Sequence, residues 1–350
     1  MKTVDYREPY TFRQYGIVRR IWRVLYPVLV GFLIMQGIAA IIGFAMGISA
    51  SMQYMPEMLE NGGVLSAEMM EEMTAKMTED MYTYSIYIQL VSTIAGLAVM
   101  LPMWLATRKY RPQIKPGTTR NGLLLTVLFF PGVALILNYI LALIGIEMPP
   151  EFEQAFEALM SAPLWLQYLT VAIIGPIFEE LIFRGVVLAR SLYWMPKWLA
   201  VAVSSVLFGI WHLNAVQLIY AIPLGILMSL LYIRYRNLLL CIAAHIACNA
   251  LSVTLNYIGE NPTANIIISI VLIVITIVAA LPLYGSKRIR LTASAMLIYP
   301  EPAEPAYEPI AADVVPVQDA DAEVTDASAG TAIAEEISGE VSEKPSDTVE

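Results

Sequence analysis

The sequence has few cysteines and histidines, two residue types that are common in enzyme sites. Its 350 residues include two cysteines and two histidines, and the HExxH segment of common zinc proteases is absent. Cys241 and Cys248 lie seven residues apart in one apolar run, and seven residues of helix rise about 10 Å, which is too far for a disulfide bridge. We therefore expect two buried thiols that serve only to pack.

Charged residues are also missing from long stretches of the chain. Hydrophobic residues make up 58% of it, against roughly 45–50% in soluble proteins. Runs of about 20 apolar residues are typical of membrane-spanning helices. The sequence has eight, near 24–48, 82–106, 121–146, 164–186, 198–214, 216–233, 238–258 and 264–284. We therefore predict an all-α, polytopic membrane helix bundle of about eight transmembrane helices.

The net charge of −9 comes from the end of the chain. Residues 301–350 hold fourteen acidic residues and one basic residue, Lys344, and are rich in Ala, Pro, Ser and Thr. Such a segment buries too little apolar surface to offset its chain entropy. We therefore predict a disordered acidic C-terminal tail without a catalytic role.

Basic and acidic loops alternate between the apolar runs. The segment before residue 24 and the loops near 108–120, 190–197, 234–236 and 287–290 are basic, whereas the loops near 57–80, 147–157 and 260 are acidic. Basic loops favour the cytoplasm, so we predict that both termini are cytoplasmic. The acidic loop at 52–81 is rich in methionine. We expect it to form a helix that packs on the bundle, with a surface-lying amphipathic helix and a methionine metal site as alternatives.

One apolar run carries charge. Seven of the eight runs contain no Asp, Glu, Lys or Arg, but the fourth contains "GPIFEELIFRG", with Glu179, Glu180 and Arg184. Charge in hydrocarbon costs at least about 2.5–3.5 kcal/mol per residue. Glu180 and Arg184 are four residues apart and can pair, whereas Glu179 points about 100° away and finds no partner on its own helix. A structural ion pair explains Glu180 and Arg184, but it leaves Glu179 unexplained.

Both histidines also lie in membrane runs. His212 ends the segment "FGIWH", one helical turn after Phe208, and His245 begins "HIACN", one turn before Asn249. A single intramembrane histidine is often only a packing residue. Together with an unpaired glutamate, however, two histidines and an asparagine form a set that can activate water, stabilise an oxyanion or hold a metal.

These three motifs, EExxxR, FxxxH and HxxxN on successive helices, resemble the CPBP family, which comprises type II CAAX prenyl proteases and their bacterial bacteriocin-processing and immunity relatives. The resemblance covers roughly residues 160–260 and divides the chain into four parts. These are a cytoplasmic N-terminal segment (1–23), N-terminal helices with the methionine-rich loop (24–160), a protease-like core (161–285) and a cytoplasmic acidic tail (286–350).

The resemblance implies an intramembrane endopeptidase that cleaves peptides or membrane proteins in contact with lipid. Glu179 would be the general base, acting with His212 on the attacking water, and His245 and Asn249 would donate hydrogen bonds to the oxyanion. Glu180, Arg184 and Phe208 would support the site. We favour a metal-free mechanism over zinc held by Glu179, His212 and His245, and we expect no other cofactor and no nucleic-acid partner.

Two other functions fit the same sequence features. One is a non-catalytic membrane protein that binds a peptide in the same cavity, such as an immunity protein. The other is a transporter with Glu179 as a proton relay, but that would predict repeats between the two halves of the chain, and all the intramembrane charges lie in the second half. A compact core without an organelle signal is typical of a bacterial plasma-membrane protein.

Overall fold

The computed structural model describes residues 16–60, 62–108, 120–146, 149–259 and 261–284. The predicted acidic tail and most of the predicted N-terminal segment lie outside these residues. Within them the chain is helical and contains no strand. The elements in chain order are α2(Ile17–Glu60), α3(Ala67–Thr83), α4(Ser85–Arg108), α5(Arg120–Leu143), α6(Pro150–Met160), α7(Leu164–Gln167), η1(Tyr168–Ile174), α8(Gly175–Glu180), η2(Leu181–Leu188), α9(Ala189–Ser191), α10(Lys197–Trp211), α11(Ala215–Tyr235), α12(Leu238–Ile258) and α13(Pro262–Tyr284).

The prediction of a polytopic helical membrane bundle is confirmed. Six described helices are long and apolar enough to cross a membrane, and they are α2, α4, α5, α11, α12 and α13. The other two predicted spans are helical as well but differ from a simple transmembrane helix. The span at 198–214 is α10, which has only 15 residues, and the charged span at 164–186 is a helical run of several joined segments.

That helical run, residues 164–191, alternates between α-helix and π-helix. The π-segments η1 and η2 lie on either side of α8, the short α-segment that carries both glutamates. A π-turn changes which residues share a face, and such turns are frequent at functional sites. Pro176 contributes to this interruption because it has no N–H to give to the preceding turn.

Small residues let the helices of the core approach closely. The antiparallel pair α10 and α11 has glycine at two crossing points, where a Cβ on Gly209 would lie 2.8 Å from Ile222 and one on Gly225 would lie 3.1 Å from Ser205. In membranes, where association depends on packing, such close contacts replace the hydrophobic driving force. Cys241 and Cys248 are buried free thiols in this core, as expected from their spacing.

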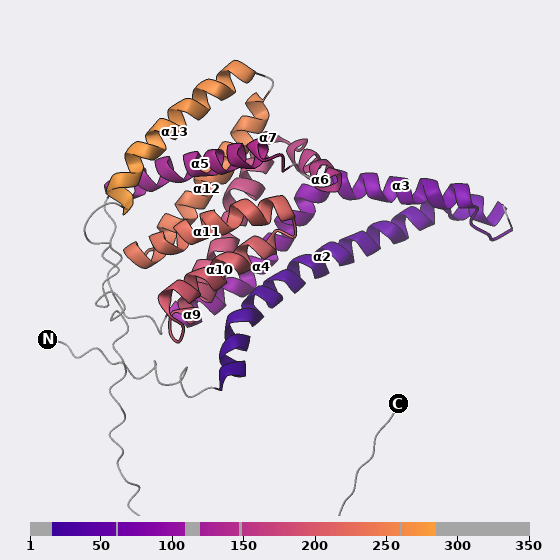
Figure 1. Ribbon diagram of the computed structural model, residues 1–350. Coiled ribbons are helices and arrows are strands. Elements are labelled where there is room, and N and C mark those ends of the chain that lie inside the picture. The colour runs from indigo at the N-terminus through magenta and orange to yellow at the C-terminus, as the bar shows by residue number, and fades with distance from the viewer. Residues whose placement is uncertain (1–15, 61, 109–119, 147–148, 260, 285–350) are drawn as a thin grey trace, which may run out of the picture. The chain divides into compact units, whose positions relative to one another are not determined.

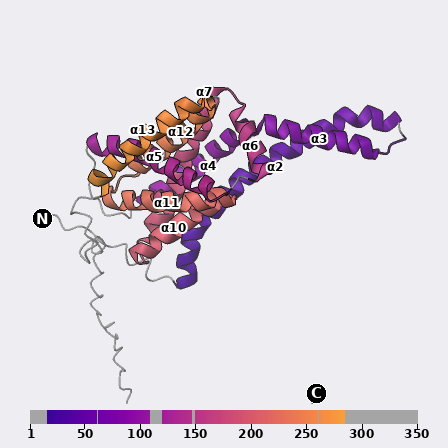
Figure 2. The same ribbon diagram turned by 45° about the horizontal axis from the view of Figure 1, so that its top comes forward.

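The α2 helix is much longer than a membrane is thick. Its 44 residues extend about 66 Å, roughly twice the hydrocarbon thickness. Figures 1 and 2 show that its C-terminal part runs beside α3 as a two-helix arm that extends away from the other helices. The methionine-rich segment therefore forms a helix, and Met77 and Met81 of α3 pack against Gly47 and Gly43 of α2.

Candidate functional site

The centre of the core is a buried network around Glu180. Its Oε1 atom accepts a hydrogen bond of 2.6 Å from Nη1 of Arg184 and lies 3.0 Å from Nδ1 of His245. The Glu180 and Arg184 side chains are completely buried. The ion pair expected from their spacing is thus present, and His245 joins it from α12.

Arg184 is held by two further groups. Its Nη2 atom donates to the carbonyl oxygen of Gly225 at 3.2 Å, and its guanidinium lies over the Phe208 ring, 4.4 Å from the ring centroid. The charge of Arg184 is thus balanced, although its Nε atom and Oε2 of Glu180 are buried without a hydrogen-bond partner among the described residues. The network therefore ties the charged helix to α10, α11 and α12 at one point.

Glu179 has a different environment from its neighbour. Its side chain is 19% exposed, and its Oε2 atom lies 3.6 Å from Nε2 of His245. That separation is longer than a hydrogen bond, and the same oxygen has no hydrogen-bond partner within the described part of the chain. The contact with His245 is therefore too long to satisfy this oxygen by a hydrogen bond and too short to hold another group between the two side chains.

His212 lies at the end of α10, in a turn with unusual backbone geometry. The next residue, Leu213, has a φ angle of 53°, which is uncommon for a residue other than glycine. Asn214 then caps α11 by accepting hydrogen bonds from the N–H groups of Val216 and Gln217. Strained positions of this kind cluster at functional sites, because the surrounding structure must hold them in place.

The tautomer of neutral His212 follows from its main-chain partner. Its Nδ1 atom lies 2.9 Å from the carbonyl oxygen of Phe208, which can only accept a hydrogen bond. Nδ1 therefore carries the hydrogen, and Nε2 of a neutral ring keeps its lone pair. The Phe208 ring also packs edge-on against both histidines, with centroid distances of 5.1 Å to His212 and 5.6 Å to His245.

The side chain of Asn249 bonds to a main-chain carbonyl in the charged helix, next to Pro176. The N–H of Gly175 bonds to Thr170, and the next residue, Pro176, has no N–H to offer to the carbonyl of Val171. The side-chain amide of Asn249 donates to that carbonyl at 2.9 Å. One of its two N–H hydrogens thus has a partner, and the second is available to the cavity.

These side chains meet in a cavity of about 670 Å³, a size typical of ligand sites. Glu179, His212, His245, Asn249 and Phe208 all line it. Its walls are otherwise apolar or uncharged, and the apolar face of α6 closes part of it with Phe152, Phe156 and Leu159. Glu180 and Arg184 lie behind the lining.

The metal hypothesis finds little geometric support. Within the described residues, no three His, Cys, Asp or Glu side chains are grouped closely enough to hold a metal ion. One nitrogen of His245 lies next to Glu180, and one nitrogen of His212 is bonded to the main chain. Contacts of this kind at Nδ1 are also found in metal-bound histidines, so it is the separation of Glu179, His212 and His245, and not their hydrogen bonds, that departs from a three-ligand zinc site.

Two features of the site were missed by the sequence analysis. The bond between Asn249 and Val171 depends on Pro176, and a proline inside an apolar run is a signal that a nearby carbonyl will need a donor from another helix. The carbonyl of Gly225, which binds Arg184, has no signal of its own, because any residue supplies a main-chain oxygen.

Comparisons with known proteins agree with these observations. The chain is 30% identical over 143 residues to a protein of Bacillus subtilis (strain 168) named "Putative membrane peptidase YdiL", and the match covers 39% of this chain and 57% of that protein. The chain thus spans little more than half the length of that relative. A comparison with solved structures found no match.

A family model matches the part of the chain that contains all three motifs. The matched residues, 161–251, run from the start of the charged helix to just beyond Asn249. With its membrane-length helices, the chain is an integral membrane protein. The resemblance noted in the sequence is therefore confirmed for this region: residues 161–251 match the model of the Rce1-like type II CAAX prenyl endopeptidase family.

Proposed function

We propose that the protein is an intramembrane endopeptidase that hydrolyses peptide bonds of membrane-associated peptides or proteins. The observation that carries this proposal is the position of Glu179, whose partly exposed side chain lines the cavity beside His245. A carboxylate in the membrane interior is costly, and such groups are retained where they serve a function. The match of residues 161–251 to an endopeptidase family supports the same conclusion.

In the proposed reaction, Glu179 takes a proton from a water molecule that attacks the substrate carbonyl. His212 assists through Nε2, since its other nitrogen is bonded to the Phe208 carbonyl. Glu179 and His212 line the same cavity from different helices, so a water between them could contact both. Acid–base catalysis by a positioned side chain contributes about 10²–10⁴-fold to the rate.

The oxyanion that forms on the substrate carbonyl would be stabilised by His245 and Asn249. Asn249 has a free N–H after bonding to Val171, and His245 can donate from Nε2 when it is protonated. A protonated His245 together with Arg184 would balance the charges of Glu179 and Glu180, since all four side chains belong to one connected group. Donors fixed in a site of low dielectric are effective because they need no reorganisation.

Glu180, Arg184 and Phe208 would hold the reacting groups in place. Glu180 orients His245 by accepting from Nδ1, Arg184 holds Glu180, and the Phe208 ring separates the two histidines. The mechanism needs no metal and no other cofactor. No step in it involves a nucleic acid.

We further propose that the protein lies in a bacterial plasma membrane with both termini in the cytoplasm. The Bacillus subtilis relative supports the first part, and the alternation of basic and acidic loops supports the second. Reporter fusions after Arg23 and after Arg290 should both report a cytoplasmic position. An external signal from either fusion would contradict this topology.

Replacing the proposed base is the direct test of the enzyme. Glu179→Gln keeps the size and polarity of the side chain but cannot accept the proton, so peptide cleavage should fall by about 10²–10⁴-fold. The midpoint temperature of thermal unfolding in detergent should be unchanged or slightly higher, because a buried charge is removed. Near-normal cleavage by this variant would exclude Glu179 as the base. The absence of cleavage by the unmodified chain would instead favour a non-catalytic peptide-binding or bacteriocin-immunity protein.

A further inference from the structure

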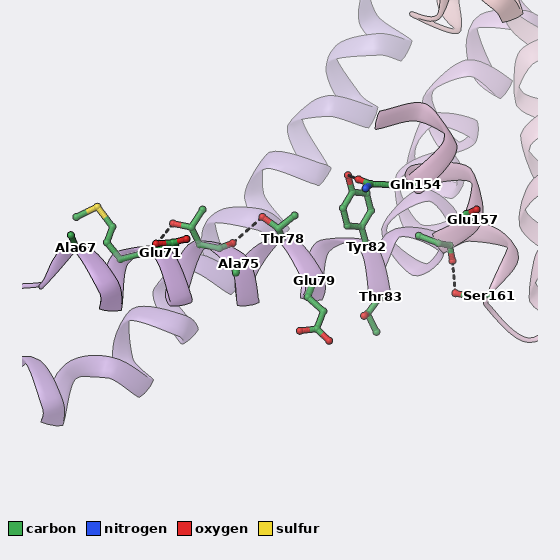
Figure 3. A pocket seen from close by; sticks show the side chains of 13 residues that line it. Ala67, Glu71, Ala75, Thr78, Glu79, Tyr82, Thr83, Gln154, Glu157 and Ser161 are labelled. Atoms are coloured by element: carbon green, nitrogen blue, oxygen red, sulfur yellow. Dashed lines mark hydrogen bonds between the residues drawn. The ribbon is translucent and has the colours of Figure 1, made fainter. Parts of the chain in front are cut away.

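A second large cavity lies outside the proposed active site, in an open groove along one face of α3 that α6 bounds at its inner end (Figure 3). Its volume is about 1130 Å³, and Figure 3 shows its lining side chains. On α3 these residues recur at helical spacing along one face, and α6 contributes Gln154, Glu157 and Ala158, with Ser161 directly after its end. The opposite face of α3 carries Met73 and Met77, which contact α2. The groove face is therefore not needed to hold the arm together.

The floor of this groove is apolar in spite of its polar sequence. The hydroxyls of Thr74 and Thr78 each donate to the carbonyl four residues earlier, at 2.7 and 2.8 Å, so their hydrogens are used within the helix. Ala75 and Ala158 add small apolar surfaces. The inner end is closed where Tyr82 reaches toward Gln154, with 3.5 Å between their oxygens (Figure 3). The result is an open trough with room for side chains.

The charge at the groove has one sign. Glu71, Glu79 and Glu157 line it, and no lysine or arginine among the described residues does. Glu68, Glu72 and Lys76 of α3 and Glu153 of α6 lie outside the lining. An apolar floor with an acidic rim is complementary to a segment that has apolar side chains on one face and Lys or Arg on the other.

The groove and the proposed active site share α6 as a wall. Gln154, Glu157 and Ala158 face the groove, whereas Phe152, Ala155 and Phe156 face the catalytic cavity. A helix is about 10–12 Å across. Since an extended chain covers about 3.3–3.6 Å per residue, three or four residues are enough to pass from one side of α6 to the other.

We propose that this groove binds a cationic, amphipathic segment of the substrate that lies outside the membrane, while the adjoining part of the same chain enters the catalytic cavity past α6. The proposal rests on the peptidase function proposed above. It narrows the substrate class to polypeptides that have a basic segment a few residues from the bond that is cleaved. Anionic lipid surfaces and acidic peptides would be repelled from the same rim.

The experiment measures peptide binding to the full chain in lipid nanodiscs, in the Glu179→Gln background so that nothing is cleaved. The probe is a fluorescent lysine-rich amphipathic peptide, and its control is the same peptide with glutamine in place of each lysine. The groove variant is Glu71→Gln, Glu79→Gln and Glu157→Gln combined. The matched variant is Glu68→Gln, Glu72→Gln and Glu153→Gln, which removes the same charge from the same helices outside the groove.

The groove variant should raise the Kd of the lysine peptide about ten-fold, as expected for the loss of three exposed charge pairs, and leave the glutamine peptide unchanged. The matched variant should change the Kd less than two-fold, and added salt should reproduce the effect of the groove variant. Equal effects of the two triple variants, or no effect of either, would overturn the proposal.

Cleavage by chains that retain Glu179 separates this inference from the proposed function. A ten-fold rise in KM for the lysine peptide in the groove variant, with kcat unchanged, supports both. The same KM in both chains overturns the groove proposal and leaves the peptidase intact. Selective binding of the lysine peptide without any cleavage supports the groove as a binding site and contradicts the peptidase.

Discussion

The helical run at 164–191 and the two-helix arm of α2 and α3 both carry carboxylates, but in opposite surroundings. In the helical run, Glu180 is completely buried and is compensated by Arg184 and His245. On the arm, the acidic residues of α3 lie toward solvent, and only Met69 of that helix is buried. The charge of a glutamate is therefore stabilised by specific side-chain partners in the helical run and by water on the arm.

This difference separates positions that determine stability from positions that determine recognition. A buried carboxylate without its partner loses several kcal/mol, because no water replaces the lost bonds. A surface carboxylate contributes about 0–1 kcal/mol and is free to meet a ligand. Substitutions in the two regions should therefore differ in both the size and the kind of their effects.

The largest effect on stability is expected at Glu180. Glu180→Gln leaves Arg184 as a buried charge whose carboxylate partner is gone and weakens the bond to His245. We expect a loss of about 3–5 kcal/mol in the free energy of unfolding, together with loss of cleavage. Unfolding in detergent, compared with Glu179→Gln, measures the difference between the two neighbours.

The two glutamates also provide the control. Both substitutions remove one negative charge from α8, so a general effect of charge would lower stability equally in both variants. Equal stabilities for Glu179→Gln and Glu180→Gln would show that the network around Arg184 does not stabilise the core. The comparison between the buried network and the solvated arm would then lose its basis.

The helices and the pairing of Glu180 with Arg184 could be predicted from the sequence, because each depends on residues that are close together in the chain. Long apolar runs predicted the helices, and the four-residue spacing predicted the pairing of Glu180 with Arg184. The motifs also indicated which side chains line one cavity. In each case a periodic pattern or a scarce residue type carried the signal.

Other features depended on contacts between distant segments and could not be predicted in this way. The pairing of His245 with Glu180 spans 65 residues, and no periodicity within either helix encodes it. The span at 198–214 was expected to be an ordinary transmembrane helix, but α10 ends at Trp211 after 15 residues. The turn that follows, with Leu213 in a left-handed conformation, is held by the surrounding helices.

A smaller effect is expected where Asn249 compensates for Pro176. Asn249→Ala leaves the Val171 carbonyl without its side-chain donor, which should cost about 1–3 kcal/mol. In a Pro176→Ala background, residue 176 regains an N–H that can bond to that carbonyl. The stability cost of Asn249→Ala should then fall by at least about 0.5 kcal/mol.

A double-mutant cycle on unfolding in detergent measures this coupling, and cleavage gives an independent readout. If Asn249 also binds the oxyanion, Asn249→Ala should lower the cleavage rate in both backgrounds, because a main-chain N–H at 176 restores the helix but not the donor in the cavity. Additive effects on stability would mean that Asn249 does not replace the missing N–H.

The smallest effect is expected on the arm, where Met77 packs against α2. Its sulfur would lie 3.4 Å from a Cβ added to Gly47, so the two helices are in direct contact there. Met77→Ala should loosen this contact at a cost of about 1 kcal/mol, below the range for a fully buried methionine, since water reaches part of the arm. Hydrogen exchange should become faster in α3 and stay unchanged in α12, because local unfolding of the arm does not require the core to open. Met70→Ala is the matched control, because Met70 is 50% exposed and faces the groove. Hydrogen exchange in α3 and α12 should be the same in this variant as in the unmodified chain. Faster exchange in α12 after Met77→Ala would show that the arm and the core unfold together, and the two regions would have to be treated as one cooperative unit.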